Sequence, residues 1–176
     1  MATTAQQNIN LASSNKWSLN LSNFPNMISS QNIQMLYETF VKSINLPPYN
    51  LSFIDSEFKD TIIHRPISKK NDEFESLSIS FSLDENFENY FNLHLYLQKL
   101  RYSVDIPTTF LYQNTVRSID VFCKNNQNIS QKILRFSECM IENLGELVLE
   151  FGEYEAPSFT VDFKYREVLM VTADNI

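Results

Sequence analysis

The sequence predicts a mainly β protein, an antiparallel sandwich or barrel with one flanking helix. Most segments alternate apolar and polar residues with a period of two, which is typical of half-buried strands. Only one segment carries a long apolar stripe at helical spacing, and no strand–helix–strand rhythm indicates a parallel sheet. A chain of 176 residues fits one domain. We place this domain at residues 16–170, between a flexible N-terminal arm (1–15) and a C-terminal tail (171–176).

The first half of the chain contains several strand patterns. Trp17, Leu19 and Leu21 alternate with polar residues before Pro25 ends the run. Further strands are expected at residues 37–44, 51–53, 61–64 and 77–83. Residues 35–37 fit a helical turn equally well, so the start of the second strand stays open. The charged stretch 65–74 contains a proline and is interpreted as a loop.

One helix is predicted directly after the strand at 77–83. Asp84 is its expected N-cap, with Glu85 and Glu88 in the first turn, where negative charge suits the helix dipole. Apolar residues then recur every three or four positions, so one face should pack on the sandwich. The expected core face consists of Phe87, Tyr90, Phe91, His94 and Leu97. The residues expected to point outward are Glu88, Asn92 and Lys99.

The second half of the chain predicts a hairpin and a final aromatic strand. Residues 119–123 and 129–136 read as two strands joined by the polar turn 125–128. A short strand is expected at 147–149, before a break that contains Gly152 and Pro157. Alternating aromatic and apolar residues then indicate a last strand at 159–165.

Composition and charge exclude several classes of protein. Hydrophobic residues make up 43% of the chain, too many for a disordered protein. No run approaches the ~18 apolar residues that a membrane span needs, and the N-terminus lacks a secretion-signal layout, so we expect a soluble protein made in a cytoplasm. With only two glycines, Gly145 and Gly152, phosphate-binding loops such as GxGxxG cannot form.

The charge of the chain is unevenly distributed. Twelve basic and twelve acidic residues balance in 1–137, whereas 138–176 contains nine acidic and two basic residues. The whole net charge of −7 therefore falls in the last segment. Because there is no basic patch, tight binding to nucleic-acid phosphates is not expected. We interpret the acidic segment as a solvated face or, functionally, as a surface that does not retain a passing polyanion.

The residues that usually carry chemistry form no recognisable site. Cys123 and Cys139 lack zinc-ligand spacing and have apolar neighbours, so both are expected to act as small hydrophobic residues. His64 and His94 lie 30 residues apart, and no GxSxG nucleophile motif is present. Three nearby acids have no EF-hand pattern around them, namely Asp72, Glu73 and Glu75. We therefore expect no catalytic residue, no metal and no cofactor.

The order of these elements resembles the tail tube proteins of contractile-tailed bacteriophages. Residues 17–21 resemble the first strand of that family, and residues 40–47 resemble its strand leading into a Leu-Pro corner. Residues 77–85 match a strand that enters a helix through an acidic cap, and 133–165 resemble the hairpin, polar break and final aromatic strand. The resemblance covers about residues 15–168. The family often has a tryptophan near the helix and another after the hairpin, whereas the only tryptophan of this chain is Trp17.

The resemblance implies a two-sheet sandwich of the tail-tube type with one flanking helix. Such proteins form homohexameric rings that stack into the inner tail tube, through which DNA passes transiently without sequence-specific binding. The implied partners are tail sheath, baseplate and neck proteins and a tape measure protein in the lumen. The implied location is the virion tail, assembled in the bacterial cytoplasm. In relatives a loop in the position of residues 50–74 joins adjacent rings, which implies a ring-stacking interface at Ile62, Ile63, Ile67, Lys69 and Lys70.

Three other functions remain open at this stage. A sister protein of the same fold could start the tube at the baseplate or end it at the neck. A tube subunit of a type VI secretion machine or a contractile bacteriocin would have the same fold without DNA passage. A small carbohydrate-binding sandwich is a further alternative, although such modules usually expose several aromatic side chains.

Overall fold

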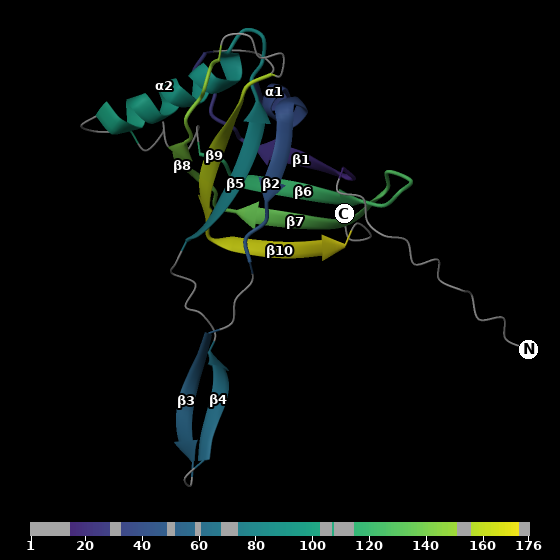
Figure 1. The fold of residues 1–176 in the computed structure, drawn as a ribbon, viewed down its shortest axis with the longest axis vertical. Coiled ribbons are helices and arrows are strands. Elements are labelled where there is room, and N and C mark those ends of the chain that lie inside the picture. Colours follow the sequence, from purple (N-terminus) through teal and green to yellow (C-terminus); the bar gives the residue numbers. More distant parts are fainter. Residues whose placement is uncertain are drawn as a thin grey trace, which may run out of the picture.

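Two antiparallel four-stranded sheets form the body of the protein (Figure 1). The computed structural model describes residues 15–28, 33–48, 52–58, 61–67, 74–102, 107, 115–150 and 156–172. Sheet I has the strand order β1 (Trp17–Ser22), β6 (Ser118–Lys124), β7 (Ser130–Ser137), β10 (Glu167–Thr172). Sheet II has the order β2 (Val41–Asn45), β5 (Glu75–Ser82), β9 (Ser158–Tyr165), β8 (Met140–Leu144). The predicted two-sheet, mainly β fold is confirmed.

Two helices lie at one end of the sandwich, α1 (Ile33–Phe40) and α2 (Glu88–Tyr102). A separate hairpin, β3 (Ser52–Phe58) with β4 (Thr61–Ile67), extends from the opposite end, between β2 and β5 (Figure 1). Within the described residues, no helix is long and apolar enough to cross a membrane. The expected N-terminal arm, except for Asn15, and residues 173–176 of the expected tail lie outside the described residues.

The core lies between the sheets and follows the predicted alternation closely. In β5, Leu77, Ile79 and Phe81 are fully buried, whereas the serines between them face outward. In β9 the same pattern buries Phe159, Val161, Phe163 and Tyr165. Because each strand has one buried face, a shift of one residue would expose this whole set, and the pairing register is strongly specified.

The hairpin of β6 and β7 is confirmed, and its turn shows why asparagines occupy it. The side-chain oxygen of Asn125 accepts hydrogen bonds from the backbone N–H groups of Gln127 (2.9 Å) and Ile129 (3.0 Å). Asn128 has a φ of 63°, a left-handed conformation that asparagine tolerates well. Local side-chain chemistry therefore performs the task that glycine performs in most hairpins.

The strand predicted at residues 37–44 is wrong in its first half, because α1 occupies residues 33–40 and only β2 follows as a strand. Ile33 and Tyr37, one helical turn apart, are both buried. The Tyr37 ring packs against Phe24, with a centroid distance of 4.2 Å, and against Phe81, at 5.4 Å. This aromatic cluster joins segments that are distant in the sequence. The local pattern alone therefore could not decide between a helix and a strand here.

Two further strand predictions and one loop prediction need correction. Residues 147–149 form no strand, whereas β8 lies earlier, at Met140–Leu144. The strand at 159–165 is confirmed as β9 but is not the last, since β10 follows it and extends to Thr172. The charged stretch expected as a loop from residue 65 begins inside β4. In β10 the large residues Leu169 and Met170 are both exposed, so this strand lacks the alternation that would have predicted it.

Asp84 caps the start of α2, but from a turn that precedes the helix. Its carboxylate accepts the backbone N–H of Asn86 at 3.1 Å and of Asn89 at 2.8 Å. Phe87 between them has a φ of 61°, so the helix begins at Glu88 and Glu85 lies outside it. The predicted capping residue is thus correct, and the helix starts later than its acidic first turn suggested.

The buried face of α2 is rotated relative to the prediction. The fully or nearly fully buried residues are Asn89, Asn92, Leu93 and Tyr96. Phe91 is 53% exposed and His94 is also exposed, so the prediction of both as core residues is wrong. Phe87, Tyr90 and Leu97 are half-buried against the core. Asn92, expected outside, is buried, whereas Lys99 is exposed as predicted and Glu88 is half-buried.

Hydrogen bonds explain this rotation. The side-chain oxygen of Asn92 accepts the Met27 N–H at 2.6 Å, and its amide donates to the Pro25 carbonyl at 2.7 Å and to the Tyr37 hydroxyl at 3.3 Å. The Asn89 amide donates to the Ser82 carbonyl at 2.8 Å. Buried amides with such partners are well tolerated. Among the described residues, every buried side-chain nitrogen and oxygen has a hydrogen-bond partner.

Candidate assembly interface

Metal ligands and reactive side chains are considered first. Within them, no group of three His, Cys, Asp or Glu side chains could hold a metal ion. Cys139 is fully buried, and burial raises the pKa of its thiol to about 12. Burial also raises the pKa of the Tyr37 hydroxyl. Both groups therefore stay protonated and unreactive in the folded protein.

The β3–β4 hairpin carries three of the residues proposed for ring stacking. In its register Ile62 lies opposite Glu57, Ile63 opposite Ser56, and Ile67 opposite Ser52. The other two candidates, Lys69 and Lys70, lie outside the described residues. The seven residues of each strand form a longer ordered element than the short strands expected here. Because the hairpin extends beyond the sandwich, it is placed to contact another molecule (Figure 1).

The outward face of sheet II is made mainly of small hydroxyl side chains, cross-linked from strand to strand. Ser80 and Thr160 share a hydrogen bond of 3.1 Å, and Ser78 donates to the Asp162 carboxylate. Lys164 donates to Ser76 at 2.8 Å. Asp162 also accepts from Asn143 at 3.1 Å, and Lys164 lies 3.5 Å from Glu142. The charges on this face are therefore partly compensated.

The edges of sheet II are open within the described part of the chain. There, β2 pairs only with β5, and β8 only with β9. Both edge strands are five residues long, and a bulge interrupts each of them. An open edge exposes a row of backbone donors and acceptors that can pair with another strand. The open edges of sheet II were not predicted from the sequence, because the apolar alternation of β8 is short and a bulge interrupts it.

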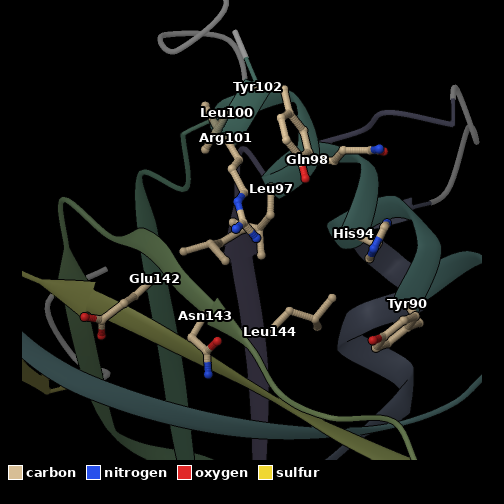
Figure 2. A pocket seen from close by; sticks show the side chains of 11 residues that line it. Tyr90, His94, Leu97, Gln98, Leu100, Arg101, Tyr102, Glu142, Asn143 and Leu144 are labelled. Carbon is tan, nitrogen blue, oxygen red and sulfur yellow. The ribbon is translucent and has the colours of Figure 1, made fainter.

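A groove of about 590 Å³ lies between α2 and β8. Its apolar part consists of Leu97, Leu100, Ile141 and Leu144. Figure 2 shows Leu97 and Arg101 pointing from α2 into the space above Asn143 and Leu144 of β8. An apolar groove bordered by an open strand edge is the arrangement that proteins use to bind a further strand with its neighbouring side chains.

Exposed apolar side chains lie on α2 and on the side of the molecule formed by α1 and β2. On α2, Phe91, Leu95 and Tyr102 are 53%, 42% and 71% exposed. On the side of α1 and β2, Met35 and Leu46 are 65% and 47% exposed. Single exposed apolar residues are common on protein surfaces.

Comparison with known proteins identifies the fold. No family model matches the sequence, and no curated protein matches it. Among solved structures, the chain is similar to one in the cryo-EM structure of the tube-terminating cap of the anti-feeding prophage, with a TM-score of 0.64 and 12% identity over 98% of this chain and 100% of that one. It is also similar to a chain of the sheath/tube terminator of PVC, an extracellular contractile injection system, with a TM-score of 0.62, 8% identity and coverage of 93% and 99%.

A third similar structure is the sheath–tube complex of PVC in its extended state, with a TM-score of 0.59 and 8% identity over 98% of this chain and 100% of that chain. At these identities the likeness establishes the fold alone. The chain has the fold found in tube and terminator structures of contractile injection systems, and the likeness extends over nearly the whole of each chain.

Proposed function

We propose that this chain is a non-enzymatic structural subunit of the tube of a contractile tail or contractile injection machine. The observation that supports it best is the likeness of fold, which covers 98% of this chain and all of a tube-terminating-cap chain and a sheath–tube-complex chain. In this proposal six copies form a ring, and rings stack into the inner tail tube of a virion.

The β3–β4 hairpin is the proposed stacking element. It leaves the sandwich at the end opposite the helices, so it can reach an adjacent ring along the tube axis (Figure 1). Ile62, Ile63 and Ile67 in β4 are the proposed apolar contacts, and Lys69 and Lys70 in the following segment are the proposed polar ones. A projecting two-stranded hairpin is marginally stable by itself, and a neighbouring ring would stabilise it.

A subunit of the tail tube would contact several other proteins of the tail. Tail sheath would surround the tube, baseplate and neck proteins would contact its two ends, and a tape measure protein would occupy the lumen during assembly. In a phage, DNA would pass through without sequence-specific binding. Sheet II offers a suitable channel wall, because its hydroxyl groups already bond to one another and its charges are partly compensated.

Negative-stain electron microscopy of the purified protein tests the proposal directly. We expect rings at low concentration and stacked tubes at high concentration. Light scattering on the dilute samples should show an oligomer of about six subunits. A strictly monomeric protein across a wide concentration range would refute the proposed function.

A terminator of the tube is the second candidate function. It is favoured by the similarity to the tube-terminating cap, whose TM-score of 0.64 exceeds the 0.59 of the sheath–tube complex. A terminator forms one ring, whereas a main tube subunit forms a long stack. Isolated rings that never elongate, even at high protein concentration, would therefore favour the terminator.

A further inference from the structure

The outer edge of β10 is the least protected strand edge of the two sheets. Within the described residues β10 pairs only with β7, and Figure 1 shows it at the border of sheet I. This pairing runs without a bulge, and the strand contains neither proline nor lysine. Leu169 and Met170, in the centre of the strand, are 45% and 69% exposed. A regular apolar edge of this kind pairs readily with another strand.

The other three edges carry features that limit such pairing. A bulge interrupts both β2 and β8, and each of these strands has a charged side chain, Lys42 and Glu142. At the opposite edge of sheet I, α1 packs against β1, and the Glu38 carboxylate accepts the Leu21 N–H at 2.8 Å. Proteins use bulges, charges and covering elements to keep strand edges apart. In the described part of the chain, the centre of β10 has none of these features, so its natural partner is an apolar strand.

The position of its one charge makes a second β10 strand a suitable partner. The only charged residue of β10 is Glu167, at its first position. When two β10 strands pair in antiparallel orientation, either Leu169 or Met170 faces its own copy across a two-fold axis. The two Glu167 carboxylates then lie towards opposite ends of the pair, at least about 13 Å apart along the strands. The centre of the contact consists of the apolar residues 168–171.

Both exposed side chains would gain contacts in this pair. Met170 lies opposite Leu134, which packs on the core, so Leu169 points to the other face of sheet I. Pairing places Leu169 beside Leu169 or Val171 of the second copy. It places Met170 beside Met170 or Val168 of that copy. Cross-strand apolar pairs of this kind stabilise a sheet, and one contact covers both exposed residues.

We propose that two unassembled copies of this chain pair through their β10 strands and join their sheets I into one continuous sheet. The contact does not depend on the proposed function. A two-fold contact uses the same patch on both copies and closes after two subunits. Neighbours in a six-fold ring are related by a six-fold rotation, so this contact does not build a ring. It covers Leu169 and Met170 in the free protein, before other contacts form.

Cysteine substitution on β10 tests the pair. L169C or M170C, whichever position lies on the two-fold axis, should give a disulfide-linked dimer under mild oxidation, because directly opposed residues in antiparallel strands meet disulfide geometry. The product should stop at the dimer, since each copy has one such edge. The unsubstituted protein, with half-buried Cys123 and buried Cys139, is the background control. K99C, at an exposed position on α2, measures random collision.

A charge substitution tests the same contact in solution. Sedimentation velocity, below the concentration at which rings form, should show a dimer of the unsubstituted protein. L169K and M170K should each raise the dissociation constant of this dimer about tenfold or more, because lysine on a strand edge opposes pairing. L95K makes the same change on α2, where Leu95 is 42% exposed, and should leave the dimer unchanged. Thermal unfolding of each variant separates loss of the dimer from loss of folding.

Four results would overturn the β10 pair. Rings in micrographs without any dimer in dilute solution would exclude the pair and leave the tube function standing. Cross-linking of L169C and M170C no faster than that of K99C would reduce the contact to random collision. A dimer that persists in both lysine variants would place the contact elsewhere. Folded lysine variants that no longer form rings would assign β10 to the ring itself.

Discussion

The asparagine network under α2 predicts that a polar residue contributes more to stability than an exposed phenylalanine. Asn92 is fully buried and bonds to three groups, the Met27 N–H, the Pro25 carbonyl and the Tyr37 hydroxyl. The substitution Asn92→Ala removes all three bonds at once. Phe91, the next residue towards the N-terminus, is 53% exposed and serves as the comparison.

The magnitude follows from the groups that lose their partners. A buried donor or acceptor without a partner costs about 1–3 kcal/mol, and Asn92→Ala leaves two backbone groups in this state. Alanine returns about 0.5 kcal/mol through its higher helix propensity. The net loss should be about 3 kcal/mol, a large part of the 5–15 kcal/mol typical of a domain. Phe91→Ala removes a half-exposed ring and should cost less than about 1 kcal/mol.

Urea unfolding, followed by the fluorescence of Trp17 and by circular dichroism, measures both values. With a slope of about 2 kcal/mol per M, the midpoint of Asn92→Ala should fall by about 1.5 M. Glu88→Ala, on the same helix, should change the stability by about 0.5 kcal/mol or less. If Phe91→Ala proved the more destabilising, by the 3–5 kcal/mol of a buried phenylalanine, the orientation of α2 described here would be refuted.

Three further predictions concern pH, charge and stacking. Burial raises the pKa of Cys139 and of Tyr37, so both stay neutral when folded but ionise in the unfolded chain above their ordinary pKa values of 9.0 and 10.0. Stability in urea titrations should therefore fall as pH rises above 9, with a later onset in Cys139→Ala. Arg135→Ala leaves the nearly buried Asp120 carboxylate without its two 2.9 Å bonds and should lower the free energy of unfolding by about 1–2 kcal/mol in urea titrations. Deleting residues 65–72 should leave single rings in micrographs, and tubes of normal length would contradict the stacking role of the hairpin.

The strands that could be predicted from the sequence are those with one strictly buried face. Leu77, Ile79 and Phe81 alternate with serines because one face of β5 meets the core and the other meets solvent. The turn at Asn125 could be predicted because its hydrogen bonds are local. β10 could not, since an edge strand with exposed Leu169 and Met170 has no such alternation.

The orientation of α2 could not be predicted for a different reason. Apolar residues occur on more than one side of this helix, so their spacing does not identify the buried face. Asn89 and Asn92 are buried because Ser82, Pro25 and Met27 offer backbone partners, and those partners lie on other segments. The groove between α2 and β8 could not be predicted for the same reason, because it lies between elements that are about 40 residues apart in the chain. The resemblance to tail tube proteins indicated the region of the hairpin, and its stacking role stays a prediction.

The acidic C-terminal quarter suggested a surface that repels a polyanion. In the structure, however, two of these acids are paired with basic and polar side chains. Of the acids in this segment, Asp162 and Glu142 lie on sheet II beside Lys164, Ser78 and Asn143. If sheet II lines the channel, its wall is mainly hydroxyl, with charges that cancel at short range. Repulsion would then contribute little at physiological salt, where screening acts over about 8 Å. Such a wall would instead avoid retaining cargo because its polar groups already bond to one another, leaving few donors for phosphates. Transport through it should therefore depend only weakly on ionic strength, whereas an acidic wall would give a strong dependence.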